Sequence, residues 1–318
     1  MSDGNRRPHI TVVGDLILDR YLIGDATKLN PEMPGVVIRV EKEDDRLGGA
    51  AAVAMIAAGF GAKVTLAGVV GDDEPGHRLR RLLDAHSIES HLWIDGRPTT
   101  WKQRIVARGQ LRPDRCDRET TTPVGQDAET FLAAVPLGDL LLISDYGKGV
   151  CTHLLLKELV SRANAIGKPV LVDPARARAW SDYGPVTLIK ANLAEAADEL
   201  NAEQVAPIAL ATALSKKHRC QVVVTLGEHG LVCAELDQEP SHISAIPVDA
   251  RDVCGAGDTV FAALGLRLAH QHTLTQACQF ATAAAGDQVA TIGITIPFGK
   301  LPISENPSLM LPSRRSVA

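Results

Sequence analysis

Short runs of apolar, often β-branched residues alternate along most of the chain with longer stretches that suit helices. The runs predict buried strands at Ile10–Val13, Lys63–Val69, Leu140–Ser144, Val170–Val172, Thr187–Lys190 and Gln221–Thr225. Helices are expected between them, at Ala50–Gly59, Pro75–His86, His153–Gly167, Glu195–Leu200 and Pro207–His218. This alternation is typical of an α/β fold with a doubly wound, mostly parallel sheet flanked by helices, whose ligands bind beyond the carboxyl ends of the strands. We expect residues 1–318 to form one such domain.

Two segments, Arg20–Arg46 and His91–Arg118, interrupt this pattern with extended stretches such as Val36–Val40 and Trp101–Val106. Both follow elements that should end at the ligand edge of the sheet. Two hairpin insertions there would form a small β-strand lid that keeps water out of the site. Surface hairpins without a function are the alternative. Because the edges of a small sheet are open to pairing, we expect a homodimer formed through the lid.

Composition and charge narrow the range of possible folds, partners and locations. Hydrophobic residues make up 45% of the 318 residues and aromatic residues only 3%, which indicates an aliphatic core between helices and a parallel sheet. A net charge of −5 gives no electrostatic case for nucleic acid or an anionic membrane. No apolar run approaches the length of a membrane span and Met1–His9 is polar, so a cytoplasmic protein is predicted. The six cysteines include no C-x-x-C pair, which favours reduced thiols.

The most informative chemistry lies at residues 252–259, which read DVCGAGDT. Gly255, Ala256 and Gly257 carry little side-chain bulk, so backbone N–H groups can close on a phosphate at the start of the apolar helix that follows. Asp258 stands beside that anion site, where a carboxylate suits the role of general base for an attacking alcohol. The alternative is a glycine turn before an ordinary buried helix. A dinucleotide-binding loop is excluded, because that motif follows the first strand and reads G-x-G-x-x-G.

This loop resembles the C-terminal signature of the ribokinase (pfkB) family of carbohydrate kinases. Other segments follow in the family's order, namely Val13–Asp15, Leu47–Ala51, Val70–Asp73, Ser144–Gly149, Asp173–Pro174, Asn192–Glu195 and Thr225–Gly230. The resemblance covers residues 10 to about 300. It implies an ATP-dependent sugar kinase with direct in-line transfer, in which Asp258 is the base and the Gly255–Gly257 amides stabilise the developing charge.

Within the family, four segments are similar to the branch that phosphorylates the C1 hydroxyl of D-glycero-D-manno-heptose 7-phosphate. They are Asp15–Tyr21, Asn30–Glu32, Thr99–Arg104 and Ser144–Gly149. That branch makes nucleotide-activated heptose for lipopolysaccharide or capsule. The resemblance therefore implies a heptose phosphate as the acceptor.

The resemblance assigns several residues to the sugar. Asp15, after the first strand, would accept hydrogen bonds from sugar hydroxyls, although a strand-end cap is its alternative role. Gly48 and Gly49 would let backbone amides approach the sugar. A phosphorylated acceptor needs further cations, and the candidates at the ligand edge are Lys102, Arg104, Arg108, Arg112, Lys148, Arg176 and Arg178. From the branch-like motifs we select Asp145, Lys102, Arg104 and Lys148 as substrate-binding residues.

The resemblance also assigns the nucleotide and its Mg²⁺. Asn192 and Glu195 lie one helical turn apart and would place Mg²⁺ on the phosphates, largely through water. A helix N-cap with Glu at its third position is the alternative. Lys190 would reach an ATP phosphate, and Thr225, Gly227 and Gly230 would cradle the phosphates or ribose. Thr282 would face adenine, unless Ala281–Gly286 is simply a buried Ala-rich helix. A monovalent cation, common in the family, would sit among backbone carbonyls near Asp252 and Thr291–Gly293.

Two departures from the family pattern affect sugar recognition. Ala52 stands where the sugar loop usually carries Asn, and Asp173–Pro174 continues with Ala175–Arg176 where heptose kinases have Lys. Another pfkB-type kinase, acting on fructose, a sugar phosphate or a nucleoside, therefore stays open. A non-catalytic sugar-binding regulator is the more distant alternative, and the intact Asp258 argues against it.

Overall fold

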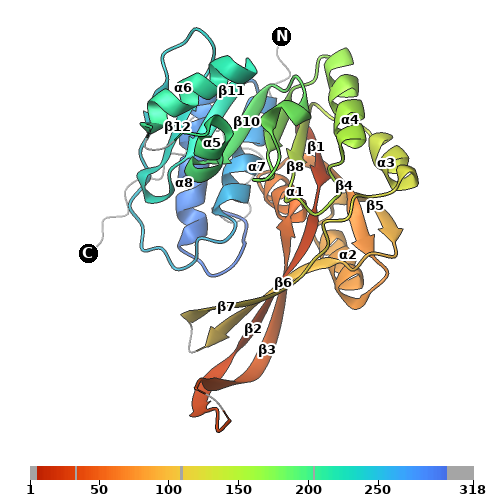
Figure 1. The fold of residues 1–318 in the computed structure, drawn as a ribbon, viewed down its shortest axis with the longest axis vertical. Coiled ribbons are helices and arrows are strands. Elements are labelled where there is room, and N and C mark those ends of the chain that lie inside the picture. Colours follow the sequence, from red (N-terminus) through yellow and green to blue (C-terminus); the bar gives the residue numbers. More distant parts are fainter. Residues whose placement is uncertain (1–5, 33, 108–109, 203–204, 299–318) are drawn as a thin grey trace.

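The computed structural model of the chain describes residues 6–32, 34–107, 110–202 and 205–298. Seven strands run parallel: β1 (His9–Gly14), β4 (Lys63–Gly71), β5 (Glu89–Asp95), β8 (Leu140–Ser144), β9 (Val170–Asp173), β10 (Leu188–Asn192) and β11 (Gln221–Thr225). Two more, β12 (Leu231–Ala234) and β13 (Ser241–Ile243), join one edge as antiparallel strands. Within the described residues these form one nine-stranded sheet, in the order β13-β12-β11-β10-β9-β8-β1-β4-β5 (Figure 1).

Helices cover both faces of this sheet. One face packs against α1 (Ala50–Gly59), α2 (Glu74–Ala85), α7 (Ala256–Ala269) and α8 (Leu274–Val289), and the other against α3 (Gln126–Ala133), α4 (His153–Ala165), α5 (Leu193–Leu200) and α6 (Pro207–His218). Successive strand residues point to opposite faces, so Leu142 lies in the first core while Leu141 and Ile143 lie in the second. The predicted doubly wound, mostly parallel α/β fold is confirmed.

A second, four-stranded sheet projects from the main body (Figure 1). Its order is β3 (Val36–Gly49), β2 (Leu16–Leu29), β6 (Thr100–Ala107) and β7 (Gln110–Arg118). The sequence predicted its second insertion to begin at His91, but Glu89–Asp95 pairs in parallel with β4 and belongs to the main sheet. The first insertion is also longer than predicted, because its strands continue to Leu16 and Gly49.

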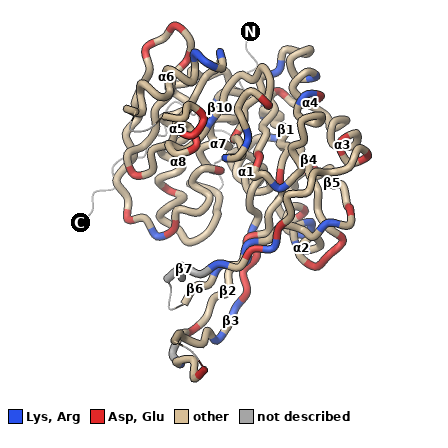
Figure 2. Tube along the Cα trace, in the orientation of Figure 1, with Lys and Arg blue, Asp and Glu red and all other residues tan. Residues whose placement is uncertain are grey.

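Charged residues of both signs gather where the small sheet leaves the body (Figure 2). Arg20 of β2 pairs with Asp45 of β3 at 2.7 Å and with Glu74 of α2 at 3.1 Å. Arg78 of α2 reaches Asp45 as well, at 3.1 Å. Because Arg20 and Asp45 are shielded from water, these pairs help to fix the root of the small sheet against α2.

Two further predictions concern membrane-spanning segments and disulfide bonds. None of the helices in the described ranges is both long and apolar enough to cross a bilayer. All six cysteines are free thiols, which agrees with the spacing in the sequence.

Candidate active site

The carboxyl ends of the parallel strands meet at one edge of the main sheet. Gly14 is in register with Ser144, and Ser144 is in register with Asp173. Asn192 and Thr225 close β10 and β11 side by side. The candidate residues that follow these strands therefore converge, because parallel strands end together.

Asp258 lies in the first turn of α7, directly after the tight turn that the sequence predicts. Gly255 is the N-cap residue of this helix and adopts a left-handed conformation with a φ of 75°. A Cβ atom at this position would lie 2.5 Å from Cγ1 of Ile294, so glycine is required for two reasons. The helix dipole and the first-turn N–H groups favour an anion beside the Asp258 carboxylate. The Ala256 N–H, however, already donates to the Val253 carbonyl at 3.3 Å, and the phosphate contacts of this loop stay a prediction.

The Asp258 side chain is set up to accept a proton. It is only 5% exposed, and it accepts a hydrogen bond of 2.7 Å from the Tyr146 hydroxyl. Burial raises the pKa of Asp258 to about 6; the Tyr146 hydrogen bond opposes this rise and the Asp173 charge adds to it. Near neutral pH Asp258 is therefore mostly ionised, yet its pKa is close enough to neutrality for a general base. Burial and the Asp258 charge raise the pKa of Tyr146, so that its hydroxyl keeps its proton.

Lys190 brings a positive charge to the same loop. Its ammonium group pairs with the Asp173 carboxylate at 2.8 Å. A Cβ atom on Gly257 would lie 3.1 Å from Lys190 Nζ, which places the ammonium directly beside the glycine loop. Burial alone would lower the pKa of Lys190, but Asp173 more than offsets this effect and the pKa is raised. A charged ammonium beside the N-terminus of α7 suits the phosphate contact predicted for Lys190.

Asp15 makes contacts with the protein itself that the sequence did not specify. Its carboxylate accepts backbone N–H hydrogen bonds from Tyr146 at 2.8 Å, Lys148 at 3.0 Å and Val150 at 3.2 Å. Burial, together with the Asp145 charge, raises the pKa of Asp15 to about 6. Asp15 is 1% exposed, so it holds the loop after β8 in place. These contacts match the capping role that the sequence left open, whereas the sugar contact stays a prediction.

Asp145 is likewise occupied by the protein. One carboxylate oxygen accepts from Arg178 at 2.9 Å and from the Tyr183 hydroxyl at 2.8 Å. The other oxygen accepts the Gly147 N–H at 2.8 Å. In the structure these contacts order the loop that carries Tyr146, and a sugar contact of Asp145 remains a prediction.

Asp19 is an acidic residue of the site that the sequence reasoning missed. It lies on β2 in register with Lys102 of β6, is 5% exposed, and accepts a hydrogen bond from Arg104. A Cβ atom on Gly48 would lie 2.4 Å from Asp19 Oδ2, so Gly48 makes room for this carboxylate. The Asp19 charge also raises the pKa of Asp258, which places the two in one electrostatic environment. A signal existed in the sequence, since Asp19 lies within the branch-like segment Asp15–Tyr21.

The other sugar-loop glycine also meets backbone. Gly49 has a φ of 58°, and a Cβ atom there would lie 2.5 Å from the carbonyl oxygen of Asp15. Glycine is therefore needed where β3 passes β2, whether or not a sugar binds beside it.

Most of the predicted cations have acidic partners. Arg104 pairs with Asp19, and Lys148 pairs with Glu119 at 2.8 Å. Arg178 pairs with Asp145, and Arg176 pairs with Asp198 near the surface. Arg108 and the side chain of Arg112 lie outside the described residues.

Lys102 differs from these cations. No ion pair joins it to any residue that the structure describes, and its Nζ lies 5.3 Å from the centre of the Tyr146 ring. Burial lowers the pKa of Lys102, as expected for a half-buried ammonium without a close counter-charge. Among the candidate cations whose side chains the structure describes, it is therefore the one best placed, and without an ion pair, for an anionic group on the acceptor.

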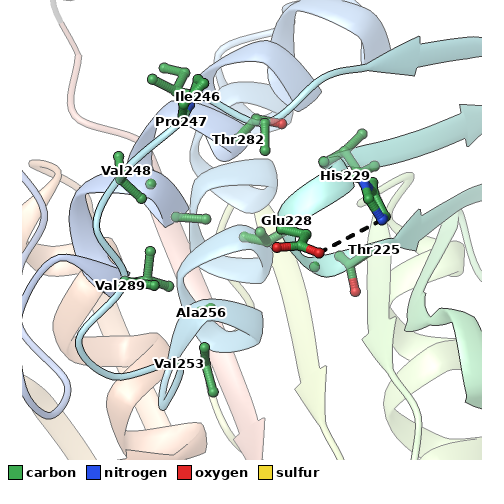
Figure 3. A pocket seen from close by; sticks show the side chains of 18 of the residues that line it. Thr225, Glu228, His229, Ile246, Pro247, Val248, Val253, Ala256, Thr282 and Val289 are labelled. Carbon is green, nitrogen blue, oxygen red and sulfur yellow. Dashed lines mark ion pairs between the residues drawn. The ribbon is translucent and has the colours of Figure 1, made fainter.

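A cavity of about 720 Å³ adjoins the glycine loop. It is lined by the loop residues Ala256 and Gly257 and by four of the residues predicted to bind the nucleotide, Thr225, Gly227, Gly230 and Thr282. Figure 3 shows Val253 and Ala256 towards one end of the cavity and Thr282 and Ile246 towards the other. Its volume is in the range of small-molecule sites. The Thr282 hydroxyl already donates to the Cys278 carbonyl at 2.9 Å, so it is left to act as an acceptor.

The sequence reasoning missed much of the apolar wall of this cavity. Ile246, Pro247, Val248 and Val253 come from the stretch between β13 and α7, and Val289 comes from α8. That stretch has neither a two-residue nor a helical period, so no pattern marks it. Its apolar side chains suit the flat face of a nucleotide base.

Asn192 and Glu195 form a capping box at the start of α5. The Asn192 side chain accepts the Glu195 N–H at 3.0 Å, and the Glu195 carboxylate accepts the Asn192 N–H at 2.8 Å. Among the described residues there is no group of three or more His, Cys, Asp or Glu side chains that could hold a metal directly. This is the helix-capping role that the sequence left open for the pair, and a water-mediated contact with Mg²⁺ stays a prediction.

A model of the pfkB family of carbohydrate kinases matches residues 7–299. The chain belongs to this family. Its pfkB relatives include a bifunctional protein HldE from Caulobacter sp. (strain K31), 38% identical over 296 residues, and one from Caulobacter vibrioides, 39% identical over 298 residues. Each match covers 90% of this chain, but the chain spans only 60% and 61% of the length of these two relatives.

Solved pfkB-type structures share the fold. Phosphofructokinase-2 from Escherichia coli in complex with potassium superposes with a TM-score of 0.77 at 22% identity, covering 92% of this chain and 96% of that one. Ribokinase from Arabidopsis thaliana, complexed with ribose and ATP, gives a TM-score of 0.69 at 19% identity, covering 91% and 94%. The fold is therefore ribokinase-like, as predicted. Family and fold together support an ATP-dependent sugar kinase.

Proposed function

We propose that this pfkB kinase transfers the γ-phosphoryl group of ATP to the C1 hydroxyl of D-glycero-D-manno-heptose 7-phosphate. The product would be the 1,7-bisphosphate used to make nucleotide-activated heptose for lipopolysaccharide or capsule. The observation that carries the kinase chemistry is the buried Asp258–Tyr146 pair at the N-terminus of α7, next to a cavity of about 720 Å³. The heptose is supported by the branch-like motifs and by relatives that share the name HldE.

Asp258 acts as the general base in this proposal. Its pKa of about 6 leaves it ionised at neutral pH, and the Tyr146 hydroxyl holds one carboxylate oxygen. The other oxygen would take the proton of the C1 hydroxyl as that oxygen attacks phosphorus. No phosphoenzyme forms, because the transfer is a single in-line displacement.

The phosphate groups would lie between the glycine loop and Lys190. The N–H groups of Gly255 and Gly257 would donate towards the charge that develops on the γ-phosphoryl group, and Lys190 adds a fixed positive charge beside Gly257. The adenosine part would fill the apolar cavity along α8. Asn192 and Glu195 would hold Mg²⁺ through water, and the bound ion would shield the charge of the nucleotide phosphates.

The small sheet would bind the acceptor and act as the predicted lid. Asp19 presents a carboxylate for sugar hydroxyls, and Lys102 presents an unpaired ammonium for the 7-phosphate. Both lie on the same face of this sheet, since they are in register across β2 and β6. Closing this face over the base would exclude water from the reaction.

A homodimer through the small sheet is part of the proposal. β3 and β7 are the edges of this sheet within the described chain, and Val36, Val37 and Val40 of β3 are each more than 40% exposed. A second copy could pair with such an edge and cover the valines. Light scattering of the purified protein tests this; a monomer at working concentration would remove the dimer from the proposal. The cytoplasmic location also stays a prediction.

Turnover of ATP to ADP with Mg²⁺ tests the proposed reaction. The acceptors are D-glycero-D-manno-heptose 7-phosphate, fructose 6-phosphate, fructose, ribose and adenosine, and ³¹P NMR identifies the product. A new anomeric phosphate on the heptose is the expected result. Turnover of another acceptor alone would leave the base chemistry in place and overturn the heptose assignment.

Asp258→Asn separates catalysis from binding. It should abolish turnover while ATP and sugar binding, measured by calorimetry, stay close to those of the parent protein. Unchanged turnover would refute the assignment of Asp258 as the base. A protein that binds the sugar but never consumes ATP would instead be the non-catalytic regulator.

A further inference from the structure

The backbone carbonyls expected to hold a monovalent cation already have donors from the protein itself. The side-chain amide of Gln288 donates to the Gly293 carbonyl at 2.9 Å and to the Cys254 carbonyl at 3.3 Å. Arg46 donates to the carbonyl of Ile292. A dehydrated cation is held by several carbonyl oxygens at once, and here three of the oxygens near this position point at N–H groups.

The Asp252 carboxylate at this position is also satisfied from within the chain. It accepts the Cys254 N–H at 2.9 Å and the Gly293 N–H at 2.8 Å, one on each oxygen. The Gln288 side-chain oxygen accepts the Thr295 N–H at 3.0 Å. The loop before α7 and the loop after α8 are thus tied together by direct hydrogen bonds.

Arg46 supplies the charge that a cation would bring. It extends from β3, pairs with Asp44 at 2.8 Å and lies 5.0 Å from the centre of the Tyr21 ring. A Cβ atom on Gly293 would lie 2.1 Å from Arg46 Nη1, so the guanidinium rests against the backbone of this loop. A guanidinium stays charged at any physiological pH and is more weakly hydrated than an ammonium, which suits a half-buried position.

We propose that Arg46 and Gln288 take the place of the monovalent cation, so that this kinase binds its substrates and turns over without K⁺ or NH₄⁺. Gln288 binds the Cys254 carbonyl, directly before Gly255 and the start of α7. Arg46 binds the Ile292 carbonyl in the neighbouring loop, whose Gly293 N–H in turn holds Asp252. The residues present therefore do not fit the cation that the family resemblance suggests. Arg46 is a positioning residue in this scheme, because it acts on Asp258 through the backbone.

A binding measurement tests this without reference to the reaction. The melting temperature is measured in KCl and in tetramethylammonium chloride at equal ionic strength, because a cation that binds only the folded state stabilises it by RT ln(1 + [cation]/Kd) and so raises the melting temperature. Equal melting temperatures are expected. A rise that is specific to K⁺ and grows with the K⁺ concentration would overturn the proposal, even for a protein that proved inactive on the heptose.

A kinetic measurement rests on the proposed function. K⁺ should change kcat/KM by less than about twofold relative to tetramethylammonium, well below the roughly 5- to 150-fold coupling typical of an effector site. A larger, saturable activation by K⁺ would contradict the proposal. Failure of the heptose assay alone would be visible as absent turnover in both salts.

Substitution of Arg46 tests its role through a loss of turnover that guanidinium can partly restore. Arg46→Ala should lower kcat by about tenfold to a hundredfold, with partial recovery on addition of guanidinium chloride at concentrations that leave the parent protein folded. Arg39→Ala, on the exposed part of the same strand, is the matched control and should show neither effect. If circular dichroism shows that the alanine variant is unfolded, Arg46→Lys replaces it in the same assays. Full turnover of a folded Arg46 variant in the absence of added cation would overturn the positioning role.

Discussion

The hydrogen bond from Tyr146 to Asp258 makes a quantitative prediction about pH dependence. Tyr146→Phe removes the hydroxyl but keeps the ring under Lys102 and the backbone N–H that Asp15 accepts. The lost bond stabilises the ionised form of Asp258, so its loss must raise the pKa of that carboxyl. Turnover needs the ionised base, and the acidic limb of the rate profile should therefore move to higher pH.

The size of this shift follows from the structure. A hydrogen bond to a charged group contributes about 1.5–3 kcal/mol, and one pKa unit corresponds to about 1.4 kcal/mol, so a rise of about one to two units is expected. Starting from a pKa of about 6, a rise of about one unit lowers the ionised fraction at pH near 6.5 roughly threefold. Near pH 8.5 a carboxyl whose pKa has risen by about one unit is almost fully ionised, and any larger remaining difference then reports on orientation of the base or on a rise closer to two units.

The assay is kcat/KM for the acceptor measured across the acidic and neutral range at constant ionic strength, because this parameter reports pKa values of the free enzyme. Tyr183→Phe is the matched control, since that buried hydroxyl donates to Asp145 and not to Asp258. Its acidic limb should coincide with that of the parent protein. An acidic limb in Tyr146→Phe that stays in place, or moves to lower pH, would refute the reasoning.

Three other substitutions test separate parts of the site. Lys102→Ala should raise KM for heptose 7-phosphate more than KM for ATP, whereas substitution of the exposed Lys42 by alanine should change neither KM value. Equal effects on both KM values would show that Lys102 does not bind the acceptor phosphate. Gly257→Ala, whose methyl would lie 3.1 Å from Lys190 Nζ, should cut kcat about a hundredfold, while retained turnover would place the phosphates elsewhere. Asp258→Asn should raise the melting temperature at pH 7.5 by removing a buried charge that costs up to about 3 kcal/mol, since its pKa is about 6 rather than 3.8.

The sign of that stability effect is fixed by the direction of the pKa shift. A folded-state pKa above the unfolded value means that the folded protein holds the proton more tightly. The cost of the charge is therefore present in full above about pH 6 and disappears as the pH falls through the folded and then the unfolded pKa. The gain of Asp258→Asn should accordingly shrink towards pH 4, and a gain independent of pH would point to packing instead.

The main sheet was predictable because burial on both faces leaves an unmistakable apolar signature. Leu140–Ser144, Gln221–Thr225, Ala50–Gly59 and Pro207–His218 have the bounds that the pattern predicts. Glu89–Asp95 was misplaced because it is an edge strand with a largely half-exposed pattern, which reads like a surface hairpin. Hydrophobic periodicity reports burial, and an edge strand is less buried than a central strand.

The site was predictable only where one short segment carries it. Residues 255–258 work through local backbone geometry, and that geometry is written in consecutive glycines. Asp19 escaped notice because its partner Arg104 lies 85 positions away, and only the pairing of β2 with β6 brings them together. The occupation of Asp15 by three loop amides was equally invisible, since backbone donors leave no mark in a sequence.

The two sheets divide the site between them. The proposed base, its tyrosine, the phosphate-side lysine and the nucleotide cavity all belong to the main body, whereas Asp19, Lys102 and Arg104 belong to the small sheet. Under the proposed function, substitutions in β2 and β6 would change acceptor binding while the packing that positions α7 stays in place, and loss of the Asp19 charge would also lower the pKa of Asp258. The small sheet could therefore be exchanged as a module between kinases of this fold to change the acceptor.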